Sequence, residues 1–168
     1  MAIGFMEVQL LKAKGLCDTD IFGRMDPYAV IQYNGEEQRS SVAKGQGRNP
    51  AWNEKFVFKV QYPTQSKSYK IFLRIMDKDF LSADDFVGQA IVYVEDVLAI
   101  GVEKGAAELK PTKFRVIRAD QSYCGEIDVG VSFKIKKQFY NQLSRLSSVV
   151  ERVAFNHVVV GSIPTDGE

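Results

Sequence analysis

An acidic stretch in the middle of the chain, IMDKDFLSADDFVG at residues 75–88, constrains the fold most. The residues on both sides of it alternate between apolar and other side chains, with Ile71, Leu73 and Ile75 before it and Ala90, Val92 and Val94 after it. A period of two is typical of half-buried β-strands. The acidic stretch is therefore predicted to be a loop that joins two strands.

The carboxylates of this loop indicate a metal site. Like charges at 4 Å repel by roughly 1–4 kcal/mol per pair, depending on the effective dielectric, so a folded chain needs compensation for such a cluster. Asp77, Asp79 and Asp85 offer hard oxygen ligands, and no His or Cys stands near them. Such a donor set favours calcium or magnesium over zinc, copper or iron, and calcium tolerates irregular oxygen cages better.

The loop is not an EF-hand. Counted from Asp77, the fifth position is Leu81, the sixth is Ser82 and the twelfth is Gly88. An EF-hand requires an oxygen ligand, a glycine and a bidentate glutamate at these positions. The remaining ligands must come from elsewhere in the chain.

The size and charge of the chain restrict the other function classes. A chain of 168 residues with 45% hydrophobic content is enough for one well-packed domain and a modest appendage. The formal net charge is +1, which by itself predicts neither a nucleic-acid nor a membrane partner. Any electrostatic attraction must come from an uneven distribution of charge.

The termini and cysteines lead us to expect a cytoplasmic protein. The N-terminal segment lacks a basic n-region, and Glu7 and Lys12 interrupt its apolar residues, so it does not resemble a signal peptide. The two cysteines, Cys17 and Cys124, are then expected to be reduced thiols. No apolar run approaches the ~20 residues of a membrane span, and neither end carries a lipidation motif. Any membrane contact should be reversible.

The rest of the chain up to residue 136 also indicates strands. Asn34-Gly35 is a strong hairpin signal. Further alternating segments lie at residues 6–10, 29–33, 38–43, 56–60, 113–117 and 125–135, and residues 94–109 have helical tendency. The total is eight strands, which predicts an all-β, antiparallel β-sandwich with Trp52 as a core residue.

The character of the sequence changes after residue 136. Phe139, Leu143, Leu146, Val150 and Val153 recur at helical spacing between charged residues. We therefore divide the chain into a β domain at residues 1–136 and a C-terminal extension at residues 137–168. The extension is predicted to form an amphipathic helix followed by a mobile tail, with packing on the domain and binding of a membrane or partner left as alternatives.

A second acidic loop, at residues 15–26, completes a recognisable pattern. Asp20 and Asp26 are six residues apart, as are Asp79 and Asp85, and both loops follow strands. Together with Asp26-Pro27-Tyr28, Asn49-Pro50, Trp52-Asn53-Glu54 and Phe56, these residues resemble a C2 domain over about residues 1–136. The first strand directly precedes the first acidic loop, so the chain looks like the permuted, type II C2 topology. It is similar to the small plant C2 proteins called elicitor-responsive or 16 kDa phloem proteins.

The resemblance implies a calcium site of defined residues. The family's aspartate ligands fall on Asp20, Asp26, Asp77, Asp79 and Asp85, with Ser82 as an auxiliary oxygen, around two or three calcium ions. Asp18 and Asp84 do not fall on ligand positions and are interpreted as solvated loop acids.

The implied function is calcium-dependent docking on anionic membranes. Bound calcium would cancel the negative charge of the loops and admit phosphatidylserine, with phosphoinositides as a further candidate. Ile21, Phe22, Phe80 and Leu81 lie between the ligands and are predicted to insert shallowly into the bilayer. We expect a monomeric plant protein of signalling, defence or trafficking that moves from the cytoplasm to the plasma membrane when calcium rises.

Two alternatives use other surfaces. Lys55, Lys59, Lys70 and Arg74 project from strand faces opposite apolar residues, and neighbouring strands would merge them into a basic patch. Such a patch would bind phosphoinositide, a protein partner or, as in a carrier of the phloem C2 type, RNA.

Catalysis is not expected, because the one histidine lies at position 157 and no nucleophile or phosphate-loop motif is present.

Overall fold

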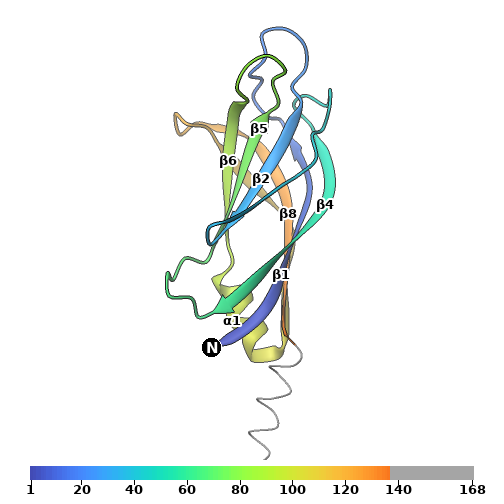
Figure 1. Ribbon diagram of the computed structural model, residues 1–168. Helices are drawn as coiled ribbons and strands as arrows, with labels where there is room; N and C mark the ends of the chain where they lie inside the picture. The colour runs from blue at the N-terminus through green and yellow to red at the C-terminus, as the bar shows by residue number, and fades with distance from the viewer. Residues whose placement is uncertain (137–168) are drawn as a thin grey trace, which may run out of the picture.

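The computed structural model describes residues 1–136 as eight strands and one helix (Figure 1). The strands are β1 (Ala2–Lys14), β2 (Pro27–Tyr33), β3 (Glu36–Arg39), β4 (Ala51–Tyr62), β5 (Lys70–Asp77), β6 (Asp85–Tyr93), β7 (Ala106–Ile117) and β8 (Tyr123–Ile135). The helix α1 (Glu95–Lys104) lies between β6 and β7 and ends at Gly105, whose φ of 90° is left-handed. The predicted extension after residue 136 lies outside the described residues.

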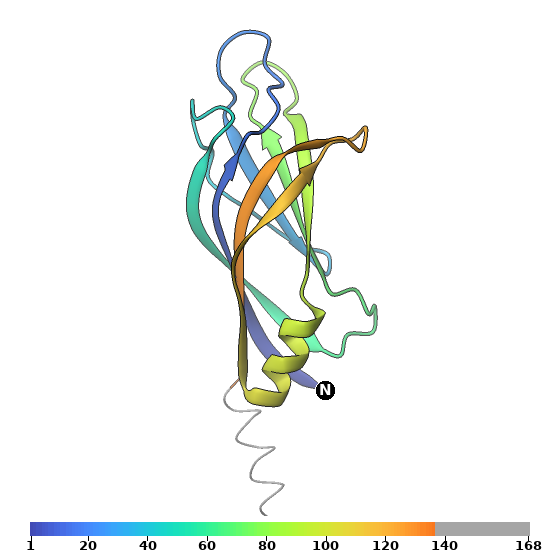
Figure 2. The ribbon, with the colours of Figure 1, turned by 180° about the vertical axis from the view of Figure 1, so that it is seen from behind.

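The strands pair antiparallel in the order β3-β2-β5-β6-β7-β8-β1-β4. One layer holds β3, β2, β5 and β6, and the other holds β7, β8, β1 and β4 (Figures 1 and 2). The layers join at a single pair, Gln89 with Ile117, between β6 and β7. At the opposite edges of the two layers, Nε2 of Gln38 in β3 donates a hydrogen bond to the carbonyl oxygen of Val57 in β4, at 2.7 Å. The predicted eight-stranded antiparallel sandwich is confirmed in a nearly barrel-like form.

The core follows from the alternation in the strands. β5 buries Ile71, Leu73 and Ile75 completely, and β4 buries Phe58 and Val60 completely. Burying each such side chain stabilises the fold by about 1.5–3 kcal/mol, so the buried faces of the strands are the main source of stability. Trp52 is buried as predicted and donates from Nε1 to the carbonyl oxygen of Pro27, at 3.2 Å.

Local predictions had mixed outcomes. The Asn34-Gly35 hairpin is confirmed, since Tyr33 pairs with Glu36 and both turn residues have positive φ. The helix within residues 94–109 is also confirmed. The strand predicted at residues 113–117 was too short, because β7 begins at Ala106 and continues past Pro111 through a shift in register.

The two cysteines are a correction. Cys17 and Cys124 are joined by a disulfide with their Cα atoms 5.4 Å apart, so the expectation of two reduced thiols is wrong. The bridge links the start of the loop after β1 to the start of β8. Separately, no helix within residues 1–136 is long and apolar enough to cross a membrane.

At the junction between the layers, β6 and β7 approach each other closely at a glycine. Replacement of this glycine should destabilise the fold. A β-carbon at Gly88 would lie 2.5 Å from Cγ1 of Val116 and 3.2 Å from the carbonyl oxygen of Ile117. Gly88→Ala should therefore force β6 away from β7 and lower the free energy of unfolding by about 1–3 kcal/mol, measured by urea denaturation.

The matched substitution for this test is Gly130→Ala. Its nearest neighbour is the ring of Pro111, 3.2 Å from the added carbon, so less strain is expected. A Gly88→Ala protein as stable as Gly130→Ala would contradict the role given to this junction.

Candidate metal centre

Three loops meet at one end of the sandwich, and two of them carry the predicted ligands. We call them the first loop (residues 15–26), the second loop (residues 40–50) and the third loop (residues 78–84); they lie at the top of Figure 1. Backbone hydrogen bonds tie them together: Lys78 donates to the carbonyl oxygen of Asp26 at 3.0 Å, and Leu16 donates to that of Arg48 at 3.0 Å. Ligands distant in sequence are thus held in one place.

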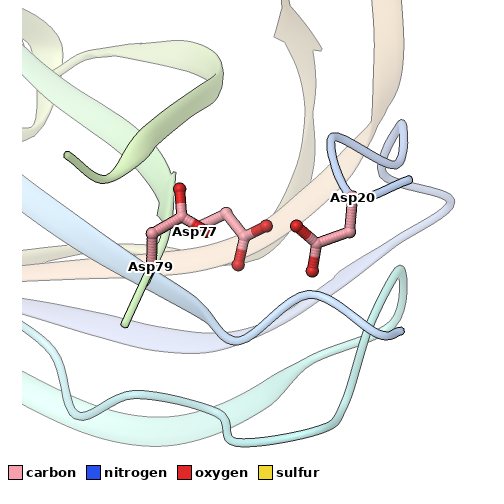
Figure 3. A group of neighbouring side chains, drawn as sticks. All are labelled: Asp20, Asp77 and Asp79. Carbon is pink, nitrogen blue, oxygen red and sulfur yellow. The ribbon is translucent and has the colours of Figure 1, made fainter. Parts of the chain in front are cut away.

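Three aspartates form the centre of this end. Asp20 lies in the first loop, Asp77 ends β5, and Asp79 follows in the third loop. One carboxylate oxygen from each lies within 4.8 Å of the others. The carboxylates of Asp20 and Asp77 face each other across a gap, with Asp79 beside Asp77 (Figure 3). The predicted gathering of acids from both loops is present for these three residues.

Asp77 is the fixed member of the group. It is 1% exposed, and its two carboxylate oxygens accept hydrogen bonds from the backbone N–H of Asp26 at 2.8 Å and the hydroxyl of Thr19 at 2.9 Å. Both donors belong to the first loop. The buried carboxylate therefore holds the first loop against the end of β5.

The other predicted ligands flank this group. Asp26 accepts a hydrogen bond on Oδ1 from the backbone N–H of Gly45 at 2.6 Å, so its carboxylate also binds the second loop. Asp85 is exposed at the start of β6 and close enough to raise the pKa of Asp79, and Ser82 is close enough to act in the opposite direction. The structure thus brings Asp20, Asp77 and Asp79 together and places Asp26, Asp85 and Ser82 around them.

The electrostatics of the centre favour a cation. Desolvation, followed by the charges of Asp77 and Asp79, raises the pKa of Asp20 above its ordinary value. Desolvation and the charge of Asp85 likewise raise the pKa of Asp79. Ionised carboxylates that repel one another in this way are stabilised when a divalent cation binds between them. The donors are all oxygens, which fits calcium.

Asp84 was misjudged from the sequence. It is not a solvated loop acid, because Oδ1 accepts the backbone N–H of Asp79 at 3.0 Å and lies 3.6 Å from Nζ of Lys78. The buried Tyr28 donates its hydroxyl to Oδ2. The hydrogen bond from Tyr28, then that from Asp79, lowers the pKa of Asp84. Asp84 and Tyr28 therefore position the backbone at Asp79.

These positioning residues had weak signals in the sequence. Asp84 stands beside Asp85 with no feature that separates a ligand from a support, and Tyr28 occurs in a strand where an aromatic residue is ordinary. Asp18 has a local role as well, since Oδ1 accepts the backbone N–H of Asp20 at 3.0 Å. Nothing in the sequence indicated that Thr19 donates a hydrogen bond to Asp77.

The predicted insertion residues lie at the tips of the loops. Ile21 and Phe22 in the first loop are each 91% exposed, and Phe80 and Leu81 in the third loop are each 99% exposed. None of the four folds back under its loop. They form an apolar edge beside the acidic group.

The residues of the predicted basic patch lie on two strands that are not neighbours. Lys55 and Lys59 lie on β4, at the edge of one layer, whereas Lys70 and Arg74 lie on β5, inside the other layer. β2 and β3 separate β5 from its own edge of the sheet. Lys55 pairs with Glu7 at 3.6 Å and Arg74 with Glu37 at 3.2 Å, which further reduces their positive character. β4 and β5 are not neighbours, so a merged patch would have to extend across β3 and β2, and it stays a prediction.

Comparison with known proteins agrees with this geometry. The family model described as the C2 domain matches residues 4–109. The chain is 46% identical over 136 residues to 16 kDa phloem protein 1 of Arabidopsis thaliana, which covers 80% of this chain and 87% of that protein. It is 45% identical over 133 residues to Elicitor-responsive protein 1 of Oryza sativa subsp. japonica, covering 77% and 84%.

A solved structure shows the same similarity. A C2 domain-containing protein from an elicitor-responsive gene superimposes with a TM-score of 0.64 and 38% sequence identity. The match covers 80% of this chain and 91% of that one. The resemblance to the small plant C2 proteins is confirmed.

The Tyr28–Asp84 contact can be tested by titration in the presence of a chelator. In Tyr28→Phe the largest cause of the low pKa of Asp84 is lost, so that pKa should rise toward the ordinary value of about 3.9, as followed by carboxyl NMR. A lowered pKa stabilises the fold above the unfolded value and loses this effect as pH falls through the folded value. The destabilisation by Tyr28→Phe should therefore be present at neutral pH and shrink in acid.

Tyr123→Phe is the control, because Tyr123 is an exposed tyrosine that contacts Arg115 and not an acid of the loops. It should leave the titration of Asp84 unchanged. An unaltered pKa of Asp84 in Tyr28→Phe would contradict the positioning role.

Proposed function

The chain belongs to the C2 domain family, and we propose that it is a calcium-dependent module that docks reversibly on anionic phospholipid membranes. C2 domains commonly bind calcium, and the C2A and C2B domains of Extended-Synaptotagmin 2, whose fold is similar, are known in a calcium-bound structure. The observation that carries the proposal is the group of Asp20, Asp77 and Asp79 at the loop end. We propose that Asp26 and Asp85 complete the cage and that Ser82 adds an auxiliary oxygen.

Calcium would act as an electrostatic switch. The five aspartates carry five negative charges, and two calcium ions supply four positive charges. Without metal, an anionic headgroup is repelled from the loops; with metal, it can approach and complete the coordination of the ions. Thermodynamic linkage then requires that calcium bind more tightly when membrane is present. Two ions, or three if a peripheral one joins, are the proposed occupancy.

The exposed loop tips would add an apolar contribution. Ile21, Phe22, Phe80 and Leu81 present four apolar side chains beside the cage. Transfer of a large apolar side chain from water is worth about 1.5–3 kcal/mol, before the cost of ordering the loops. Such an amount supports shallow, reversible insertion and not permanent anchoring.

We place this activity in the cytoplasm and at the plasma membrane of a plant cell, in signalling, defence or trafficking. The similarity to phloem and elicitor-responsive proteins supports a plant setting. The Cys17–Cys124 disulfide is unusual for the cytoplasm, where thiols are generally kept reduced. C2 domains and these relatives are generally non-enzymatic modules, and we propose no catalytic role.

The alternative is a protein or RNA carrier that uses a basic strand face. The phloem-protein relatives are consistent with it, but the basic residues predicted for it lie on separate layers. The two functions differ in their response to solution conditions. Docking through the loops should be lost on chelation, whereas RNA binding should persist without calcium and weaken with added salt.

Removal of two acids from the cage should abolish calcium-dependent docking. The protein should sediment with phosphatidylserine vesicles in calcium and be released by a chelator, and Asp20→Asn/Asp79→Asn should remove this cycle. Calcium at a hundredfold excess over its Kd should stabilise the wild type by about 2.7 kcal/mol, a Tm rise of roughly 5–11 °C for this size. The double variant should lose that rise. Without metal it should be no less stable than wild type, because two repelling charges are gone.

Glu95→Gln/Asp96→Asn is the matched control, because it removes two exposed acids from α1 at the opposite end. It should retain calcium-dependent sedimentation. Normal vesicle binding by the Asp20→Asn/Asp79→Asn protein would show that the cage is not the calcium site.

Removal of the aromatic rings at the loop tips should weaken docking without affecting the cage. Phe22→Ala/Phe80→Ala should weaken vesicle binding at least roughly tenfold, since 1.4 kcal/mol corresponds to a factor of ten and even partial burial of the two rings should together contribute about that much. Calorimetric calcium titration of the lipid-free protein should be unchanged. Val57→Ala, on the outer face of β4 and half exposed, serves as the control. Equal vesicle affinity in the loop variant and the control would exclude insertion.

A further inference from the structure

A disulfide joins the first loop to the strand β8. Cys17 lies near the start of the first loop, and Cys124 lies near the start of β8, 107 residues later. Cys124 is 1% exposed, whereas Cys17 is partly exposed. In the cytoplasm proposed above, thiols are generally kept reduced, and a bridge there is usually transient or redox-sensing. The bridge is therefore a candidate for reversible control of the first loop.

The backbone itself brings the two cysteines together. Lys14, the last residue of β1, pairs with Glu126 of β8. Just beyond this pair the two chains approach closely, because a β-carbon on Gly125 would collide with the carbonyl oxygen of Lys14 and lie 2.7 Å from the carbonyl carbon of Gly15. The Cα atoms of the cysteines are 5.4 Å apart, within the range that a disulfide spans. Strand pairing thus holds the cysteines adjacent, so the bridge can open and close again.

The bridge is also the tie between this part of the first loop and β8. Within residues 1–136, the one hydrogen bond from residues 17–26 to β7 or β8 is donated by the backbone N–H of Cys17, and Sγ of Cys124 accepts it. The residue before the bridge, Leu16, is bonded to the second loop, where the carbonyl oxygen of Arg48 accepts its N–H at 3.0 Å. Opening the bridge would therefore release the loop from β8 at Cys17.

The released segment leads directly into the acidic cage. Asp20 is three residues after Cys17, and its backbone N–H donates to Oδ1 of Asp18 at 3.0 Å. Between these two acids, the hydroxyl of Thr19 donates to Oδ2 of the buried Asp77 at 2.9 Å. A fixed backbone at Cys17 restricts the conformations of these three residues, so less ordering of the chain opposes the binding of an ion. Loss of the bridge would restore this freedom and weaken calcium binding.

A dithiol can open the bridge by thiol–disulfide exchange. Its thiolate attacks Sγ of Cys17, which belongs to the more exposed of the two residues, and forms a mixed disulfide while Cys124 leaves as a thiolate. The second thiol of the reductant then displaces Cys17 and closes the reductant's own disulfide. Two electrons and two protons pass from the dithiol to the protein, which gains two thiols.

We propose that the Cys17–Cys124 bridge is a redox switch that sets the calcium affinity of the cage. The oxidised protein binds calcium more tightly and docks at a lower calcium concentration. The reduced protein keeps its fold and needs more calcium. The inference rests on the proposed function and adds a control of the same site. Thermodynamic linkage requires the reverse effect as well, so bound calcium makes the bridge harder to reduce.

The first measurement compares calcium binding by the oxidised and the reduced protein. The calorimetric Kd for calcium should rise roughly tenfold on reduction, the scale of ordering about one backbone residue when the ion binds. Thiol alkylation and mass spectrometry verify the state of both cysteines in each sample. Dithiothreitol should open the bridge without denaturant. A bridge that resists it in the folded protein would exclude a switch.

Cys17→Ser/Cys124→Ala is the matched variant, because it cannot form the bridge and places a small apolar side chain at the buried position. It should bind calcium like the reduced wild type, with or without dithiothreitol. Calcium binding as tight as that of the oxidised wild type would show that the bridge does not set the affinity. The near-UV circular dichroism of the buried Trp52 should be the same in both redox states. Its loss on reduction would identify a bridge that holds the fold, which contradicts the proposal.

A reciprocal measurement separates failure of this inference from failure of the proposed function. The protein is equilibrated in mixtures of reduced and oxidised dithiothreitol, with a chelator or with calcium above both Kd values, and its free thiols are trapped. A tenfold difference in calcium affinity corresponds to about 30 mV for two electrons, so calcium should lower the reduction potential of the bridge by that amount. An unchanged potential in a protein that binds calcium would overturn the switch alone. If the oxidised protein binds no calcium, the proposed function fails as well.

Discussion

The repulsion between carboxylates is the constraint on which this end of the molecule depends. One carboxylate oxygen each from Asp20, Asp77 and Asp79 lies within 4.8 Å of the others. Asp77 tolerates its burial because the N–H of Asp26 and the hydroxyl of Thr19 satisfy both of its oxygens. The backbone N–H groups of Asp20 and Asp79 donate to the carboxylates of Asp18 and Asp84, which hold these two acids in place. Because protein groups fix all three positions, little ordering of the chain would oppose the binding of an ion.

The register of β2 against β5 makes this arrangement possible. Pro27 pairs with Asp77, which places Asp26 and the whole first loop beside the third loop. Because side chains alternate in a strand, a slip of one residue would turn Ile71, Leu73 and Ile75 away from the core. The burial of these residues thus fixes the position of a carboxylate several residues away. Stability and the binding site have the same origin in this pair of strands.

Much of this could be predicted from the sequence because the signals were local or carried by a motif. Alternation located the strands, Asn34-Gly35 located a hairpin, and the spacing of the aspartates located the two acidic loops. The predictions that failed depended on contacts between residues that are far apart in the sequence. The Cys17–Cys124 bridge depended on the approach of the first loop to the start of β8, and the role of Asp84 depended on the hydroxyl of Tyr28. The length of β7 was missed because Pro111, which usually ends a strand, lies at a shift in register.

The two ends of the β domain lie together at the pole opposite the loops (Figures 1 and 2). Lys136 donates its backbone N–H to the carbonyl oxygen of Ile3 at 2.9 Å, beside the pairing of Gly4 with Ile135. Anything attached to either end, whether a fluorescent reporter, a tether or a cargo protein, would hang on the side away from the docked surface. Partners fused at Met1 and directly after Lys136 would start next to each other, so the domain could bring two attached partners into proximity while its loops stay free.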